Sequence, residues 1–152
     1  MKDVIILNIL VLSALMAALP NPMAYPVERA FLENSPEVLA GLFTGTGDIT
    51  VSLPEPLSCA DQLSPDQAFL VFKRIFSVFK TSEFIADVRL TTFPGKPGGI
   101  LRARWSFQNE RTGNRYPFRV FFYLVPEKSS PGGKSGYGFP ALKIVEIRAE
   151  KL

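Results

Sequence analysis

Residues 64–80 carry the clearest helical pattern in the chain. After Ser64-Pro65-Asp66-Gln67, apolar residues recur at three- and four-residue spacing, which predicts an amphipathic helix ending near Lys80. Ser64 is suited to cap this helix, Pro65 to occupy its first position, and Gln67 to complete a capping box. The apolar stripe that we expect to face the core consists of Ala68, Phe69, Phe72, Ile75, Phe76 and Phe79.

After this helix, four runs of residues alternate between apolar and polar with the period of two that is typical of half-buried strands. They span residues 84–93, 100–107, 116–125 and 139–148, and Thr112-Gly113-Asn114 predicts a hairpin turn between the second and the third. In the last run, Glu146 follows the alternation of Leu142 and Ile144, which places it on the core side. The other interpretation, which we favour, is that Glu146 lies at the rim of the sheet, where it is exposed to water or paired with an arginine.

Before the helix, the pattern predicts two short helices and one strand. The first helical pattern covers residues 27–33, the second begins at Ser35-Pro36, and residues 49–53 alternate as a half-buried strand. Residues 54–63 are predicted to be a connector. Helices followed by a meander of strands predict an α+β fold with an antiparallel sheet packed on one side.

The N-terminus predicts export. Residues 4–19 are uncharged and strongly apolar, follow Lys2, and are shorter than the roughly 20 residues that a membrane-spanning helix needs. We therefore predict a cleaved signal peptide at residues 1–24, with Ala18 as an alternative cleavage position, and a single domain at residues 25–152 in the periplasm or outside the cell. The alternative is a protein anchored in the membrane by residues 4–19.

Composition excludes several kinds of chemistry. The net charge of +3 comes without a dense cluster of Lys and Arg, so we expect no nucleic-acid partner. The chain has no His, a single Cys at position 59 and scattered acidic residues, so we predict neither a metal site nor a cofactor. Without a His to activate it, Cys59 is expected to be an ordinary structural residue.

Arginines and aromatic residues alternate with the predicted core positions on two adjacent strands. Because neighbouring strands share their faces, these side chains are expected to project together from the outer face of the sheet. Arginine and aromatic residues are enriched at protein interfaces, and the alternative is an ordinary solvated sheet face. The interface candidates are Arg102, Arg104, Arg119, Phe121 and Tyr123.

The order of elements resembles the nuclear-transport-factor-2-like (cystatin-like α+β) superfamily, and within it small exported bacterial domains of unknown function. The likeness rests on the break at Asn34-Ser35-Pro36, the strand pattern at 49–53, the capped helix at Ser64 and the ending at residues 142–148. It implies a curved antiparallel sheet wrapped around the long helix as a cone, with a pocket at the open end. The residues predicted to line that pocket are Phe72, Phe76, Trp105, Tyr116, Phe118 and Phe122.

Enzymes of this superfamily place Asp, Tyr or His in the cone, and this chain offers only Tyr116 and Glu146 as weak catalytic candidates. We therefore expect a non-catalytic exported domain. It would bind either a protein partner or a small apolar ligand. The expected protein partner is a second copy of itself, bound through the outer sheet face. The alternative is an isomerase- or lyase-like enzyme acting on a small apolar substrate in the cone.

Overall fold

The computed structural model describes residues 21–127 and 141–152. Of the predicted signal peptide only residues 21–24 fall within these ranges. The helices are α2 (Ala24–Leu32), α3 (Pro36–Ala40) and α4 (Pro65–Val78). The strands are β1 (Ile49–Leu53), β2 (Cys59–Leu63), β3 (Phe79–Ala86), β4 (Thr91–Thr92), β5 (Gly99–Asn109), β6 (Arg115–Pro126) and β7 (Leu142–Lys151).

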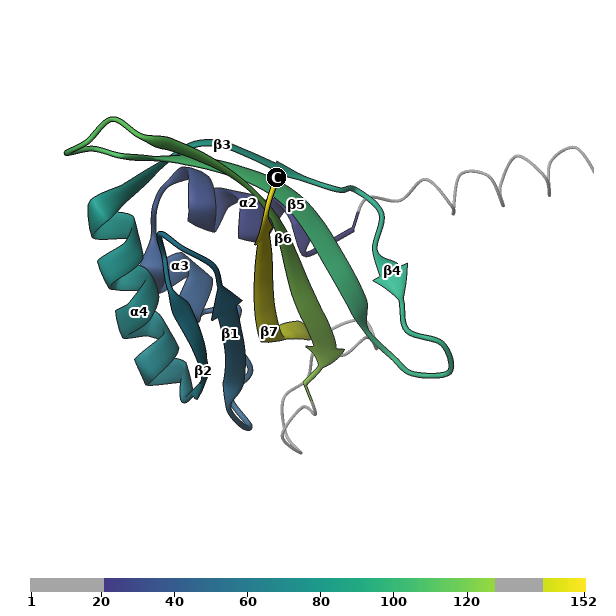
Figure 1. Cartoon of the computed structure of the whole chain (residues 1–152). Coiled ribbons are helices and arrows are strands. Elements are labelled where there is room, and N and C mark those ends of the chain that lie inside the picture. Colours follow the sequence, from purple (N-terminus) through teal and green to yellow (C-terminus); the bar gives the residue numbers. More distant parts are fainter. Residues whose placement is uncertain (1–20, 128–140) are drawn as a thin grey trace, which may run out of the picture.

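One curved sheet covers the three helices, as Figure 1 shows. Its strand order is β2-β1-β7-β6-β5-β3, and the short β4 also pairs with β5. All neighbours are antiparallel except β1 and β7, which run parallel. The predicted α+β class, with a curved sheet wrapped around the long helix, is confirmed.

Both predicted helix starts have the capping contacts that their sequences favour. Ser64 Oγ accepts from the Gln67 N–H at 3.2 Å, and the Ser64 N–H donates to Gln67 Oε1 at 3.0 Å, which completes the capping box. Ser35 Oγ accepts from the Val38 N–H at 3.1 Å. Helix α4 ends at Val78, and Lys80 Nζ donates to the Phe76 carbonyl at 2.6 Å, which places this cation at the negative end of the helix dipole.

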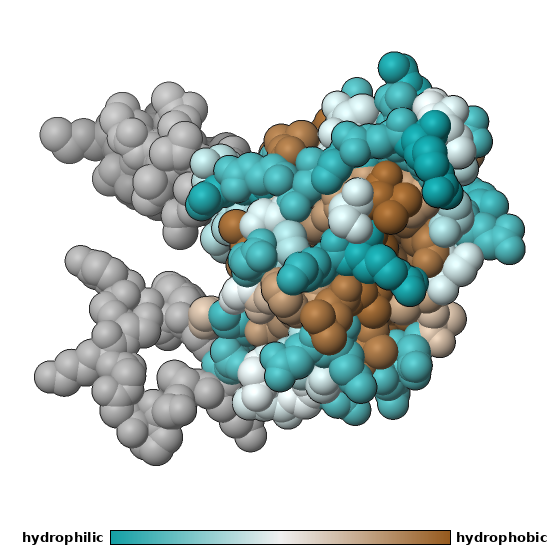
Figure 2. All heavy atoms as spheres, turned by 90° about the vertical axis from the view of Figure 1, so that its left-hand side faces the viewer, coloured by the Kyte–Doolittle hydropathy of each residue, from teal (hydrophilic) through white to brown (hydrophobic). Residues whose placement is uncertain are grey.

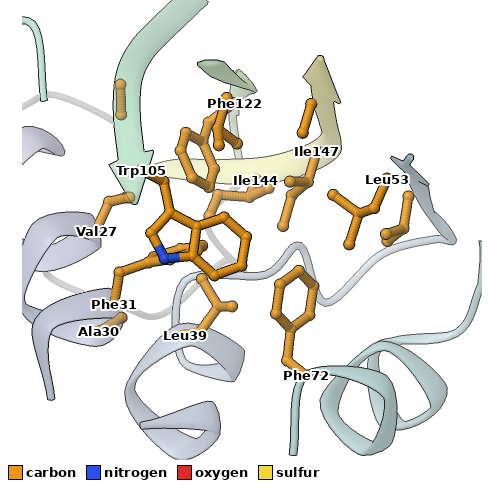
Figure 3. Close-up of a cluster of buried hydrophobic side chains, with 14 of the residues drawn as sticks. Val27, Ala30, Phe31, Leu39, Leu53, Phe72, Trp105, Phe122, Ile144 and Ile147 are labelled. Atoms are coloured by element: carbon orange, nitrogen blue, oxygen red, sulfur yellow. The ribbon is translucent and has the colours of Figure 1, made fainter. Parts of the chain in front are cut away.

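The core lies between the helices and the concave face of the sheet. Figure 3 shows Trp105 of β5 reaching from the sheet toward Phe31 of α2 and Leu39 of α3. The Phe31 ring is stacked on Phe84 at 4.5 Å between centroids and meets the Trp105 ring edge-on at 4.9 Å. Trp105 Nε1 donates to Thr81 Oγ1 at 2.9 Å, so its one polar atom is paired although the side chain is fully buried.

The prediction of a connector over residues 54–63 is wrong for its second half. Residues 59–63 form β2, which pairs with β1 from Leu53 opposite Cys59 to Ile49 opposite Leu63. This strand is at the edge of the sheet and only Leu63 is buried, so its sequence lacks the alternation of a half-buried strand.

The predicted strand over residues 84–93 is also wrong in its extent. Strand β3 begins at Phe79, inside the segment predicted as helix, and ends at Ala86. Beyond it Asp87 Oδ1 accepts from the Arg89 N–H at 3.0 Å, and the Val88 carbonyl accepts from the Asn21 N–H at 3.1 Å. The chain therefore turns out of the sheet, and Val88, which the alternation over residues 84–93 places on the same side as the buried Phe84, is 61% exposed.

A bulge in β7 changes which of its side chains face the core. Tyr123 of β6 pairs with Glu146, whereas the next residue, Leu124, pairs with Ile144, so Val145 is an extra residue in β7. As a result Ile144 and Ile147 are both fully buried, although simple alternation would place them on opposite faces. The interpretation that puts Glu146 on the core side with Ile144 is therefore wrong.

Candidate functional site

The predicted pocket residues lie together on the concave side, where they fill the space between α4 and the sheet. Phe72, Phe76, Trp105, Phe118 and Phe122 are all at most 2% exposed. Their rings pack edge-on or tilted, with centroids 5.8 Å apart for Phe72 and Phe76 and 6.2 Å apart for Trp105 and Phe118. These five side chains therefore form packed core in the described part of the chain.

The two weak catalytic candidates lie on opposite faces of the sheet. Tyr116 is half-buried on the concave face, where its ring stacks on Phe107 at 5.4 Å and meets Phe79 edge-on at 6.1 Å. Glu146 is directly opposite Tyr123 on the outer face because of the bulge in β7. The two groups consequently do not meet in one cavity.

The five predicted interface residues do share the outer sheet face. Arg102 pairs with Phe121 across the β5–β6 ladder, Arg104 pairs with Arg119, and Tyr123 lies two residues beyond Phe121 on the same side. The three arginines are exposed, and the two aromatic residues are half-buried.

Carboxylates on the neighbouring strands lie among these arginines. Arg119 Nη1 is 3.1 Å from Glu150 Oε1 of β7, and Arg104 Nε is 3.9 Å from Glu83 Oε1 of β3. Arg148 pairs with Phe121 in the β6–β7 ladder, next to Glu146 and Tyr123. The sequence did not predict which side chains of β7 lie on this outer face, because the bulge reverses the alternation on which the prediction depends.

An open hollow of about 700 Å³ lies on the outer face where β3, β5 and β6 meet. We call it the arginine hollow. Its apolar lining includes Ile85 and Leu152, which the sequence did not single out and which are 57% and 51% exposed. It is lined by Ile85, Ala86, Asp87, Arg102, Ala103, Arg104, Arg119, Phe121 and Leu152.

Other reactive groups of the described residues form no cluster. Within residues 21–127 and 141–152, no three Cys, Asp or Glu side chains are placed to hold a metal ion. Burial, and secondly the charge of Asp61, raise the pKa of the Cys59 thiol, while Arg74 acts in the opposite direction. The nucleophilic thiolate is therefore disfavoured at neutral pH.

The α4 side presents a second surface with apolar character. Figure 2, which views the molecule from this side, shows apolar atoms between hydrophilic ones. On α4, Leu70 and Val78 are 59% and 42% exposed. No helix in the described part of the chain is long and apolar enough to cross a membrane.

Comparison with solved structures finds the same architecture in proteins of very different sequence. A ketosteroid isomerase-like protein from Erwinia carotovora atroseptica is 14% identical with a TM-score of 0.62, and the match covers 90% of this chain and 95% of that one. An NTF2-like protein of unknown function in nutrient uptake from Rhodospirillum rubrum is 12% identical with a TM-score of 0.56, covering 84% and 93%. A domain of unknown function with a cystatin-like fold from Nostoc punctiforme is 9% identical with a TM-score of 0.53, covering 92% and 76%.

Sequence comparison adds no closer relationship. No family model matches the chain, and no curated protein matches it. The curved sheet, the capped α4 and the structural neighbours agree with the resemblance seen in the sequence. The chain therefore has the nuclear-transport-factor-2-like, cystatin-like α+β fold.

Proposed function

We propose that this protein is an exported, non-catalytic binding domain that pairs with a second copy of itself through the outer sheet face. The observation that carries the proposal is the mixture of charges and aromatic rings on that face. Four arginines (Arg102, Arg104, Arg119 and Arg148) lie among three carboxylates (Glu83, Glu146 and Glu150) around the half-buried Phe121 and Tyr123.

A surface with both signs of charge suits pairing with itself. In a two-fold dimer the same patch meets its own copy, so each arginine needs a carboxylate on the same patch as its partner across the interface. The half-buried rings of Phe121 and Tyr123 supply apolar area, and aromatic and arginine side chains are enriched at interface centres.

The alternative of an isomerase- or lyase-like enzyme receives less support from the geometry. Tyr116 and Glu146 lie on opposite faces of the sheet, and the predicted cone residues are packed against one another. This alternative is supported by the similarity to the Erwinia protein, which is named ketosteroid isomerase-like. At 14% identity, the similarity between the two proteins shows a shared fold and not a shared activity.

A double variant tests self-association. We expect Arg104→Glu combined with Tyr123→Ala to shift the protein from dimer to monomer in sedimentation equilibrium, because it places a carboxylate beside Glu83 and removes an apolar anchor. The matched control, Arg111→Glu with Tyr25→Ala, makes the same changes at exposed positions in the β5–β6 turn and on α2, and should remain dimeric. A wild-type protein that stays monomeric at high micromolar concentration would overturn the proposal.

The proposal of export has its own test. The apolar run of residues 4–19 supports it, and a cleaved leader lowers the intact mass of the protein isolated from the envelope of its host. A full-length mass in the membrane fraction would favour the anchored alternative.

A further inference from the structure

We propose that the arginine hollow binds a small amphipathic carboxylate, meaning a molecule with one carboxylate head and an apolar chain or ring. The hollow lies at the β3 margin of the outer sheet face, whereas Tyr123 and Glu146 lie toward β7. Its volume of about 700 Å³ is in the range of roughly 300–1,000 Å³ that small-molecule sites occupy. This site goes beyond the proposed self-association. It shares Arg102, Arg104, Arg119 and Phe121 with the proposed self-association face, so a bound ligand and a second copy compete for these residues.

The charges of the hollow favour an anion. Arg102 and Arg104 are two residues apart on β5 and therefore project from the same face, roughly 7 Å apart along the strand. Arg119 of β6 is directly opposite Arg104. Against these three guanidinium groups the lining holds one acidic side chain, Asp87, whose Oδ1 already accepts from the Arg89 N–H at 3.0 Å.

The arginines keep unused hydrogen-bonding capacity. The contacts of Arg119 with Glu150 and of Arg104 with Glu83 are exposed ion pairs, a type that contributes little and rearranges readily. Arg102 makes no ion pair with any of the residues that the structure describes. Its planar guanidinium group can donate two parallel hydrogen bonds to one carboxylate.

The apolar half of the lining selects an amphipathic ligand over an inorganic anion. Ile85 and Leu152 are more than half exposed, and Phe121 also lines the hollow. A bound apolar chain would remove this surface from water, which phosphate or chloride cannot do. The arginines and the apolar residues together therefore suit a ligand whose carboxylate head contacts the arginines and whose apolar tail covers Ile85 and Leu152.

Titration of the full-length protein with octanoate, followed by ¹H–¹⁵N correlation spectra, tests the site. We expect saturable shifts at the backbone amides of Ile85, Arg102, Arg104 and Phe121. Octanol, which lacks the charge, and acetate, which lacks the chain, should bind much more weakly. Shifts centred on the concave core, or equal binding of acetate or inorganic phosphate, would overturn the proposal.

Two single variants make the test specific. Arg102→Gln should weaken octanoate binding about tenfold or more, because a charge-assisted hydrogen bond is lost. Arg111→Gln, the matched loss of charge in the exposed β5–β6 turn, should leave the affinity unchanged. Equal affinities in the two variants would contradict the assignment. Diffusion measured in the same samples reports the oligomeric state. The titration is made at a concentration where the protein diffuses as a monomer, so a failure of octanoate binding is distinguishable from a failure of self-association.

Discussion

At the scale of single residues, Phe31 shows how much of the core one side chain can organise. Its ring lies 4.5 Å from Phe84, 4.9 Å from Trp105 and 5.6 Å from Phe122, so it joins α2 to three strands of the sheet. The sequence places Phe31 on the apolar side of a short helix but gives no sign that the aromatic residues of distant strands converge on it.

Phe31→Ala is expected to lower the free energy of unfolding by about 3–5 kcal/mol, because it leaves a cavity among rings that cannot collapse together. Leu70→Ala, a large-to-small change at a 59% exposed position of α4, should change it by less than about 1 kcal/mol. Urea unfolding followed by circular dichroism measures both variants. A similar loss in the two would show that the Phe31 cluster is not the centre of the core.

The residues of the candidate site were predictable wherever simple alternation holds. Arg102, Arg104, Arg119, Phe121 and Tyr123 share the outer face as their spacing on β5 and β6 predicts. Glu146 could not be placed, because one extra residue in β7 reverses the alternation and no residue type marks that bulge. The arginine hollow was missed because alternation shows which face of the sheet a side chain is on, but not where that face is hollowed or that Leu152 lies there.

At the scale of elements, α4 could be predicted from its own residues. The strands that the sequence did not predict depend on contacts with distant parts of the chain. The capping box of α4 depends on four adjacent residues, so it can be read directly. Strand β2 is held by its ladder to β1 and carries an exposed Asp61 and Gln62, which conceal it. The segment after β3 leaves the sheet because the Val88 carbonyl bonds to Asn21, 67 positions earlier in the chain.

The turn that joins β4 to β5 depends on glycine at position 98. Gly98 has φ +102°, and a Cβ there would lie 2.2 Å from the Leu124 carbonyl oxygen of β6. Gly98→Ala is therefore expected to cost about 2 kcal/mol or more, through backbone strain together with the clash. Gly95→Ala, with φ +65° but open space around the added atom, should cost about 1 kcal/mol. Thermal unfolding of the two variants gives the comparison, and equal melting temperatures would rule out the clash.

At the scale of the whole molecule, the fold begins before the boundary predicted from the sequence. Met23 and Ala24 are buried in the core. Asn21 is buried as well, and its Oδ1 accepts from the Met23 N–H at 2.9 Å. A domain counted from residue 25 lacks these contacts, and of the two predicted cleavage positions Ala18 leaves them intact.

Two shortened chains test this boundary. A chain beginning at Asn21 should keep the stability of the folded domain, whereas one beginning at Tyr25 should lose about 2–4 kcal/mol, since it lacks the buried Met23 side chain and the hydrogen bond from Asn21 to Val88. Differential scanning calorimetry on both chains measures the loss. Equal melting temperatures would show that residues 21–24 do not contribute to the fold.

The parallel pairing of β1 with β7 determines when the sheet can be completed. Thr50, Val51 and Ser52 bond to a strand about 95 positions later, and β7 separates the β1–β2 hairpin from β6. The hairpin therefore cannot join the sheet until β7 has been synthesised, so the core stays incomplete while the residues before β7 are being made. Closing so long a loop is slow, which gives the cell an interval in which the polypeptide is still unfolded.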